Sequence, residues 1–270
     1  MEFIKAIIFG IIEGITEWLP ISSTGHMILL NQWLQMHVRP EFWEIFLVVI
    51  QLGAIFAVIF LYFNEMLPFE ISLHNSIKFR PDTVTLWLKT LTAVLPAIIV
   101  ALPLDDTINA LFYTPLTVSI TLIAYGILFI LIEHWNKNKT FVVTDLSQIT
   151  FPMALFIGIF QLLALIPGTS RSGATIIGAM LLGISREAAA KFTFYLAVPV
   201  MLGASVLKLA KYGFAFTANE AALLLTGMAA ACIVSLIVIR FLMNFIKKHS
   251  FRIFGYYRIL LGILVFICFH

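Results

Sequence analysis

Two interruptions within apolar stretches decide the fold of this chain. Residues 18–26, WLPISSTGH, break an apolar stretch of about 3–36, and residues 166–175, IPGTSRSGAT, break a second one of about 151–185. Both interruptions combine proline and glycine with small hydroxyl residues. Irregular backbone at membrane depth is tolerated only where protein or a water-filled cavity shields it. We therefore expect each broken stretch to be a re-entrant hairpin made of two half-helices.

The composition places the rest of the chain in a membrane as well. Of its 270 residues, 61% are hydrophobic and 11% are charged, whereas a soluble domain carries about 25% charged residues. This excludes a soluble enzyme, a nucleic-acid binder and a disordered scaffold. Six stretches approach the ~20 residues that cross the hydrocarbon core of a bilayer: 43–63, 86–104, 116–133, 188–209, 220–242 and 252–269. We predict an all-α polytopic membrane protein with six transmembrane helices and two re-entrant helical hairpins.

The distribution of basic residues predicts the orientation. If both broken stretches return to the side from which they enter, the loops 64–85, 134–150 and 243–251 share one side and carry most of the loop lysines and arginines. The opposite loops, 105–115 and 211–219, contain one lysine between them and no arginine. Cytoplasmic loops are rich in Lys and Arg. Both termini are therefore expected on the extracytoplasmic side.

An internal repeat accompanies this pattern. PISSTG at 20–25 is similar to PGTSRSG at 167–173, and Gly10 and Gly158 precede the two breaks at nearly the same spacing. One hairpin would enter from each side, so the repeats would be inverted, an arrangement that places sites near the midplane. We predict a single membrane domain over 1–270, with repeat 1 at about 1–110, repeat 2 at about 150–270 and a connection at about 111–149.

Ionisable residues accompany both breaks. Glu13 and Glu17 are four residues apart and share one helix face, His26 directly follows the first break, and Arg171 lies in the second. A charged residue at the centre of a membrane helix costs about 2.5–3.5 kcal/mol on insertion scales. An ion pair that only joins the hairpins is one explanation. A functional site is the stronger one, because buried ion pairs contribute little to stability.

The residues around these charges are suited to binding an anion. Helix N-termini present free N–H groups and a partial positive charge, and two of them beside Arg171 would form a phosphate site. Serines before a helix are usually plain caps, but two breaks with adjacent charge favour the anion site. The candidate capping hydroxyls are Ser22, Ser23, Thr24, Ser170 and Ser172, and Gly168 and Gly173 would let the backbone approach a ligand closely.

Phosphoryl transfer fits this set of residues. Two carboxylates repel a phosphate unless a divalent cation bridges them, so Glu13 and Glu17 are candidate ligands for Mg²⁺ or Ca²⁺. The reaction needs positioning and charge neutralisation. Either the hydroxyl of Ser23 or a water molecule could attack, with His26 as base or acid.

Two motifs carry a family resemblance. EGITEWLPISSTGH at 13–26 together with PGTSRSGAT at 167–175 resembles the bacterial undecaprenyl-diphosphate phosphatase family, also called bacitracin-resistance proteins. The similarity covers essentially the whole chain, including FLVVIQLGA at 46–54 and LAVPVMLGA at 196–204. Trp18 departs from the family, where Phe is usual, but both are bulky aromatic residues.

The resemblance implies hydrolysis of a C55 polyprenyl diphosphate to its monophosphate and phosphate. This activity recycles a lipid carrier for cell-wall synthesis and confers bacitracin resistance. The resemblance also implies a multi-pass protein of the bacterial inner membrane whose site faces the extracytoplasmic side. The family's acidic motif falls on Glu13 and Glu17, its Ser-His element on Ser22, Ser23, Thr24 and His26, its arginine on Arg171, and its phosphate-binding stretch on Ser170, Ser172 and Thr175.

Some alternatives stay open at this stage. A polyprenyl-phosphate flippase or transporter would use broken helices in inverted repeats too, although it would need no nucleophile and base. The expected partners are the lipid substrate and membrane lipids, without nucleic acid. The oligomeric state is open, with a homodimer among the options. Arg258 lies within the last apolar stretch, where we expect it to extend to the interface or to pair.

Overall fold

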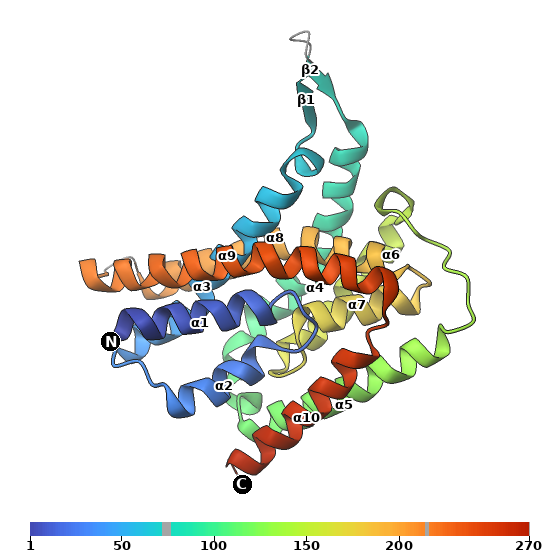
Figure 1. The fold of residues 1–270 in the computed structure, drawn as a ribbon. Helices are drawn as coiled ribbons and strands as arrows, with labels where there is room; N and C mark the ends of the chain where they lie inside the picture. The colour runs from blue at the N-terminus through green and yellow to red at the C-terminus, as the bar shows by residue number, and fades with distance from the viewer. Residues whose placement is uncertain (72–76, 214–215, 270) are drawn as a thin grey trace.

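The computed structural model shows a bundle of helices with one small β-hairpin at its edge (Figure 1). The structure describes residues 1–71, 77–213 and 216–269. In chain order the elements are α1 (Glu2–Thr16), α2 (Ser23–Trp33), α3 (Pro40–Met66), β1 (Phe69–Ile71), β2 (Ile77–Phe79), α4 (Pro81–Phe112), α5 (Pro115–Trp135), η1 (Leu146–Gln148), α6 (Phe151–Gln161), η2 (Leu162–Leu165), α7 (Arg171–Leu181), α8 (Arg186–Tyr212), α9 (Ala218–Lys248) and α10 (Arg252–Phe269).

The predicted membrane spans are confirmed as helices. In the described part of the chain, six helices are long and apolar enough to cross a membrane: α3, the first 21 residues of α4, α5, α8, α9 and α10. Their outward faces carry exposed large apolar side chains such as Ile99, Ile237 and Leu260. Soluble proteins rarely expose so large an apolar surface to water. The protein is therefore a multi-pass helical membrane protein.

One predicted loop is wrong. The stretch 105–115 was expected to connect two spans, but α4 continues to Phe112 and α5 begins at Pro115. Thr114 caps α5 by accepting a hydrogen bond from the Thr117 N–H, at 3.1 Å, so the boundary is set by this cap and by the proline. The side chains of Asp105 and Asp106 lie outside those that the structure describes.

A β-hairpin lies within the stretch 64–85, which was predicted to be a loop. Its antiparallel strands pair Phe69 with Phe79 and Glu70 with Lys78. The two phenylalanine rings lie 5.8 Å apart, and the Glu–Lys pair places opposite charges across the ladder. Such cross-strand pairs stabilise short hairpins. Strands of only three residues leave too short an alternation to be recognised from the sequence.

The loops predicted to carry the basic residues gather at one end of the molecule. Lys191, near the start of α8, lies 3.5 Å from Glu65 at the end of α3. The Phe251 N–H, between α9 and α10, donates to Glu133 near the end of α5 at 2.8 Å. In Figure 1 the hairpin and the connection after α5 lie at the top and right, whereas the two termini lie at the left and bottom.

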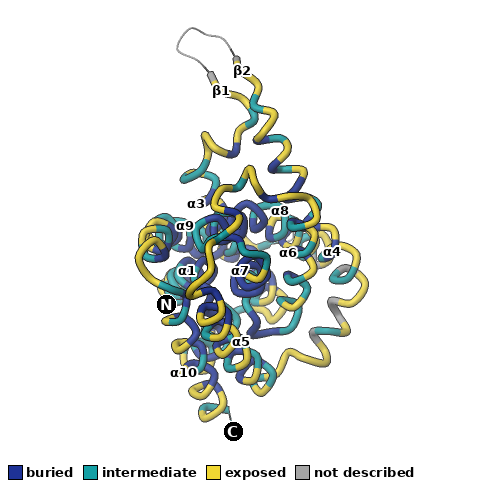
Figure 2. The backbone as a smooth tube through the Cα atoms, turned by 90° about the vertical axis from the view of Figure 1, so that its right-hand side faces the viewer, coloured by how far each residue is buried: buried dark blue, intermediate teal, exposed yellow. Residues whose placement is uncertain are grey.

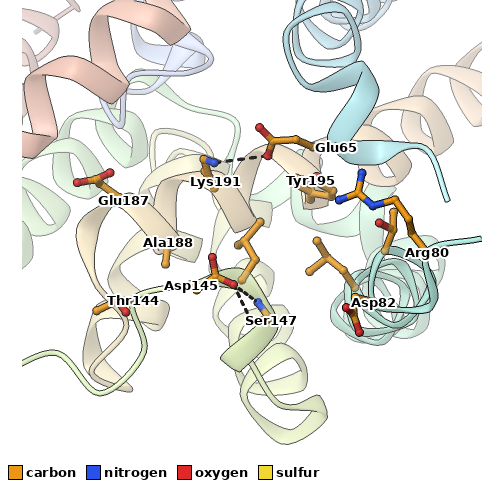
Figure 3. Close-up of a pocket in the computed structure, with 13 residues that line it drawn as sticks. Glu65, Arg80, Asp82, Thr144, Asp145, Ser147, Glu187, Ala188, Lys191 and Tyr195 are labelled. Carbon is orange, nitrogen blue, oxygen red and sulfur yellow. Dashed lines mark hydrogen bonds and ion pairs between the residues drawn. The ribbon is translucent and has the colours of Figure 1, made fainter. Parts of the chain in front are cut away.

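A cavity of about 360 Å³ opens among these loops (Figure 3). Its wall carries the charged residues Glu65, Arg80, Asp82, Asp145, Glu187 and Lys191. Asp145 accepts hydrogen bonds from the N–H and the hydroxyl of Ser147, at 2.8 and 2.6 Å, which lower the pKa of its carboxyl. The cavity lining contains none of the residues predicted to form the site.

Each broken stretch folds back so that its two ends lie together. Lys5 near the start of α1 donates to the carbonyl of Gln35 beyond α2, at 2.6 Å. The Val142 N–H, before α6, donates to the carbonyl of Gly183 beyond α7, at 2.9 Å. Both stretches thus have the geometry that the prediction requires, and their re-entry into the bilayer stays a prediction.

The two halves pack against each other in a reciprocal way. Helix α1 packs on α9 and α6 packs on α4, in both cases through a glycine. A Cβ at Gly10 would collide with the carbonyl oxygen of Gly227, and a Cβ at Gly158 would collide with that of Ala93. The expected connection 111–149 contains α5, which packs along α10. Figure 2 shows α7 as a buried helix inside the surrounding ones.

Candidate active site

Both breaks end in the same unusual helix cap. Ser22, at the N-cap of α2, has φ of 72° and accepts a hydrogen bond from the Gly25 N–H at 3.4 Å. Ser170, at the N-cap of α7, has φ of 70° and accepts from the Gly173 N–H at 3.2 Å. Of the predicted capping hydroxyls, these two perform that role. Their matching geometry gives two helix N-termini with free backbone N–H groups.

Glu17 and Arg171 meet between these N-termini. The Oε1 atom of Glu17, just after α1, lies 2.9 Å from Nη2 and 3.3 Å from Nε of Arg171, the first residue of α7. The Nη1 group of Arg171 donates to the carbonyl of Thr193 in α8 at 3.2 Å. Both side chains are about nine-tenths buried. The predicted meeting of acidic and guanidinium groups from the two stretches is therefore confirmed for this pair.

Hydroxyl groups from both breaks contact Glu17, one at its carboxylate and one at its main chain. Ser23 donates to Oε2 of Glu17 at 3.3 Å, and Ser172 donates to the main-chain carbonyl of Glu17 at 3.1 Å. The hydroxyls of Ser170 and Ser172 lie 3.2 Å apart. The predicted hydroxyls of the second break thus reach the acidic residue of the first.

The remaining predicted phosphate-binding residues have different surroundings. The Thr175 hydroxyl lies 2.9 Å from that of Thr193 and 3.0 Å from the Arg171 carbonyl, so it joins α7 to α8 behind the arginine. Thr24 is half-buried in the first turn of α2. Gly168 has φ of +88°, which favours glycine, and a Cβ there would collide with Thr121. At Gly173 a Cβ would lie 3.3 Å from that of Ser170.

His26 does not contact Ser23, although the two are three residues apart on α2. Its Nδ1 lies 2.7 Å from the Ser22 carbonyl, and its Nε2 lies 2.7 Å from the hydroxyl of Tyr257 in α10. The hydroxyl of Ser23 is instead directed to Glu17. The Glu17 carboxylate, and not the His26 imidazole, is thus the basic group that accepts the hydrogen bond of Ser23. Tyr257 was not identified from the sequence, because its role depends on contact with a residue 231 positions earlier.

Arg258 does not extend to the interface, which was one of the two arrangements expected for it. It is fully buried, and its guanidinium donates to the carbonyl of Pro20 at 3.2 Å and to those of Gly168 and Thr169 at 2.8 and 2.9 Å. It therefore joins the backbones of both breaks instead of reaching the interface. The cost of an arginine inside an apolar stretch was the signal that pointed to an important position.

The chain matches the family described as bacitracin resistance protein BacA over residues 6–264. The chain belongs to that family. Over 269 residues it is 56% identical to the undecaprenyl-diphosphatase of Acetivibrio thermocellus, covering all of this chain and 98% of that one. It is 56% identical to undecaprenyl-diphosphatase 1 of Clostridium acetobutylicum, with the same coverage. It is 54% identical to an undecaprenyl-diphosphatase of Enterococcus faecalis, covering 98% of this chain and 96% of that one.

In this member of the BacA family, Glu13 is a buried acidic residue, and no protein group accounts for the burial of its carboxylate. Its side chain is 1% exposed, and its Oε1 has no hydrogen-bond partner among the described residues. One turn later on the same face is Glu17. The described residues include no group of three or more His, Cys, Asp or Glu able to hold a metal. A Mg²⁺ ion commonly takes only one or two carboxylates and completes its shell with water and substrate phosphates. The donor chemistry of this pair suits such an ion, and both oxygens of Glu17 already accept hydrogen bonds from Ser23 and Arg171.

Proposed function

We propose that this protein is a membrane phosphatase that hydrolyses undecaprenyl diphosphate to undecaprenyl phosphate and phosphate. The observation that carries the proposal is the 2.9 Å contact between Arg171 and Glu17 at the junction of two helix N-termini. This junction offers cationic and carboxylate groups together, as phosphoryl transfer requires. The names of the relatives specify the lipid diphosphate.

The terminal phosphate is bound by the start of α7. Of the five N–H groups of an arginine, three of those on Arg171 are engaged by Glu17 and Thr193 in the described structure. Two remain for phosphate oxygens. The hydroxyls of Ser170 and Ser172 adjoin the same helix end, and the helix N-terminus adds a favourable partial charge.

Glu17 is the proton acceptor in this proposal. Its Oε2 receives the hydrogen bond of Ser23, so it is placed to take a proton from that hydroxyl or from a water molecule beside it. Attack by this oxygen on the terminal phosphorus breaks the bond to the bridging oxygen. The lipid monophosphate then leaves with the electrons of that bond. Attack by water yields phosphate directly, whereas attack by Ser23 yields a phosphoserine that a water molecule must then hydrolyse to release phosphate.

Mg²⁺ or Ca²⁺ is the proposed cofactor, held by Glu13 and Glu17. When bound, the ion would neutralise the negative charge of the phosphate beside these carboxylates. Without such neutralisation, the buried carboxylates would oppose binding of the substrate.

The proposal places the protein in the bacterial inner membrane with the site open to the extracytoplasmic side. The clustering of the basic loops at one end supports this orientation, because cytoplasmic loops are rich in Lys and Arg. A lipid with a diphosphate headgroup is the proposed partner. The comparisons give no support to the transporter alternative, since the relatives are named as diphosphatases.

Phosphate release from undecaprenyl diphosphate by purified protein in lipid nanodiscs tests the proposal. By analogy with lost oxyanion donors, Arg171→Ala should reduce the rate about 10²–10³-fold. Arg240→Ala, at an exposed arginine of α9, is the matched control and should keep the parent rate. An Arg171→Ala protein that releases phosphate at the parent rate would overturn the assignment.

A further inference from the structure

The imidazole of His26 is held at both of its nitrogens. Nδ1 lies 2.7 Å from the carbonyl oxygen of Ser22, and Nε2 lies 2.7 Å from the hydroxyl of Tyr257. The two rings are nearly parallel, at 8°, with centroids 5.7 Å apart. The ring therefore has a defined position between the first break and α10.

These contacts determine the tautomer of the neutral ring. A carbonyl oxygen can only accept, so Nδ1 carries the proton that it donates to Ser22. Nε2 then holds the lone pair and accepts the hydrogen bond from the Tyr257 hydroxyl. A backbone contact that fixes one histidine nitrogen and so assigns the role of the other is a common arrangement. Nε2 is thus the only nitrogen of neutral His26 able to accept a proton.

Tyr257 lies at the surface of the protein, beside His26. Its side chain is 43% exposed, whereas Glu17 and Arg171 are about nine-tenths buried. The hydroxyl is directed at Nε2, the nitrogen that would exchange a proton with a substrate. Proton transfer at His26 therefore depends on the position and hydrogen bond of this phenol.

We propose that Tyr257 is a positioning residue for His26. Its hydroxyl donates to Nε2 and, together with the Ser22 carbonyl on Nδ1, holds the neutral imidazole in one orientation. This rests on the proposed function, because it assigns His26 to the same reaction. Ser23 already contacts Glu17, and the lone pair of Nε2 is occupied by the Tyr257 hydroxyl. A proton that passes between His26 and the substrate or its product therefore passes by way of this phenol. By donating to Nε2, Tyr257 thus favours the neutral form of His26 when the diphosphate binds.

The surroundings of His26 contain few other groups that titrate. On α10 these are Tyr257 itself and the cation Arg258, whose charge acts on the imidazole. From the side of α1 the nearest is Glu17, which contacts Ser23 one turn away. Helix α5 presents Leu122 to the first turn of α2, and its Tyr125 ring lies 5.6 Å from the Arg258 guanidinium. A change in pH dependence after removal of one hydroxyl can therefore be assigned to the His26–Tyr257 contact.

Tyr257→Phe tests the proposal, with Tyr256→Phe as the matched control at the adjacent exposed tyrosine. Because the phenol donates to the neutral imidazole, its loss should move the acid limb of the pH–kcat profile to higher pH. We expect kcat to fall about tenfold and KM to change less than about twofold. Tyr256→Phe should keep the parent profile.

The tautomer provides a second measurement, which needs no activity. In ¹⁵N spectra of histidine-labelled protein, with the His26 signals assigned from His26→Gln, the parent should show a protonated Nδ1 and an unprotonated Nε2. Tyr257→Phe should shift the Nε2 signal, while the melting temperature stays that of the parent. A parent-like pH profile together with unchanged His26 signals would overturn the proposal. A parent protein without phosphatase activity that still shows the Tyr257-dependent signal would overturn the proposed function and leave the positioning of His26 intact.

Discussion

Ser22 and Ser170 occupy corresponding places in the two halves of the chain and share one backbone conformation, with φ of 72° and 70°. Within the described chain, no other residue except glycine has a positive φ. Such conformations are strained for a residue with a Cβ and persist where the surrounding structure holds them, often at functional sites. Here both lie where a helix starts beside Glu17 and Arg171. The repeat is therefore a repeat of local geometry as well as of sequence.

This shared strain predicts losses of stability of different size for two small substitutions at Ser170. Ser170→Ala keeps the strained φ and loses the cap, so it should cost about 1 kcal/mol and lower the melting temperature by about 2–4 °C. Ser170→Gly should cost only a few tenths of a kcal/mol, because glycine adopts this φ without strain. Thermal unfolding in detergent, followed by tryptophan fluorescence, measures both. The same two substitutions at Ser185 are the control. Ser185 is an N-cap with φ of −62°, so its backbone is not strained and glycine relieves no strain there. Equal melting temperatures for the two Ser170 variants would contradict the prediction.

The contact between α6 and α4 predicts that Gly158 tolerates no side chain. Gly158→Ala would drive a Cβ into the Ala93 carbonyl, and overpacking of this kind costs about 1–3 kcal/mol. Gly203→Ala is the control, since a Cβ there meets nothing within 4 Å, and alanine in a helix interior should add about 0.5–1 kcal/mol of stability. The melting temperatures should therefore move in opposite directions. The proposed close packing is wrong if both variants gain stability.

Arg258 is predicted to be essential for holding the two breaks together. Arg258→Met leaves the carbonyls of Pro20, Gly168 and Thr169 without their donor, and each buried unsatisfied group costs about 1–3 kcal/mol. We expect a loss of about 3 kcal/mol or more and phosphatase activity below a tenth of the parent. Arg240→Met, at an exposed position, should have little effect on either. Parent-like melting and activity for Arg258→Met would show that the breaks hold their shape without it.

The proposed cation site predicts dependence on divalent metal. Dialysis against EDTA should abolish phosphate release, and Mg²⁺ or Ca²⁺ should restore it. Glu13→Gln should raise the metal concentration required for half-maximal activity, because it removes one of two carboxylates from the proposed ligand set. Glu41→Gln, at an exposed carboxylate, should not. Full activity of the chelator-treated parent would exclude a metal role for Glu13 and Glu17.

The proposed orientation predicts which loops a membrane-impermeant thiol reagent can reach. In a protein whose Cys232 and Cys268 are replaced by serine, Gln35→Cys should react in intact cells and Lys139→Cys only after permeabilisation. Gln35 and Lys139 are both exposed, so a difference in labelling between the two positions is not caused by burial. The reverse pattern of labelling would invert the orientation and place the termini in the cytoplasm.

Much of the fold was predictable because the bilayer imposes simple constraints. The length of apolar stretches located the six long helices, and the cost of charge inside them indicated that Glu17 and Arg171 should meet. The hairpin of β1 and β2 and the end of α4 were missed, since short strands and a helix boundary depend on local pairing and capping. Hydropathy carries little information about either.

The finer details of the site depend on tertiary contacts. Ser23 and His26 are close in sequence, yet one contacts Glu17 and the other contacts Tyr257. The sequence left open whether Arg258 extends to the interface or pairs, because its acceptors are carbonyl oxygens, which the sequence does not distinguish. The sequence thus indicated most of the participants but not which of them contact one another.

The distance along the chain between Glu17 and its partner constrains how the protein is made. Arg171 follows Glu17 by 154 residues, and translation at about 5–20 residues per second adds that length in roughly 8–30 seconds. During this interval the first broken stretch has left the ribosome while its carboxylate lacks the guanidinium. A newly synthesised N-terminal half therefore spends this interval without the guanidinium that its carboxylate contacts in the finished protein.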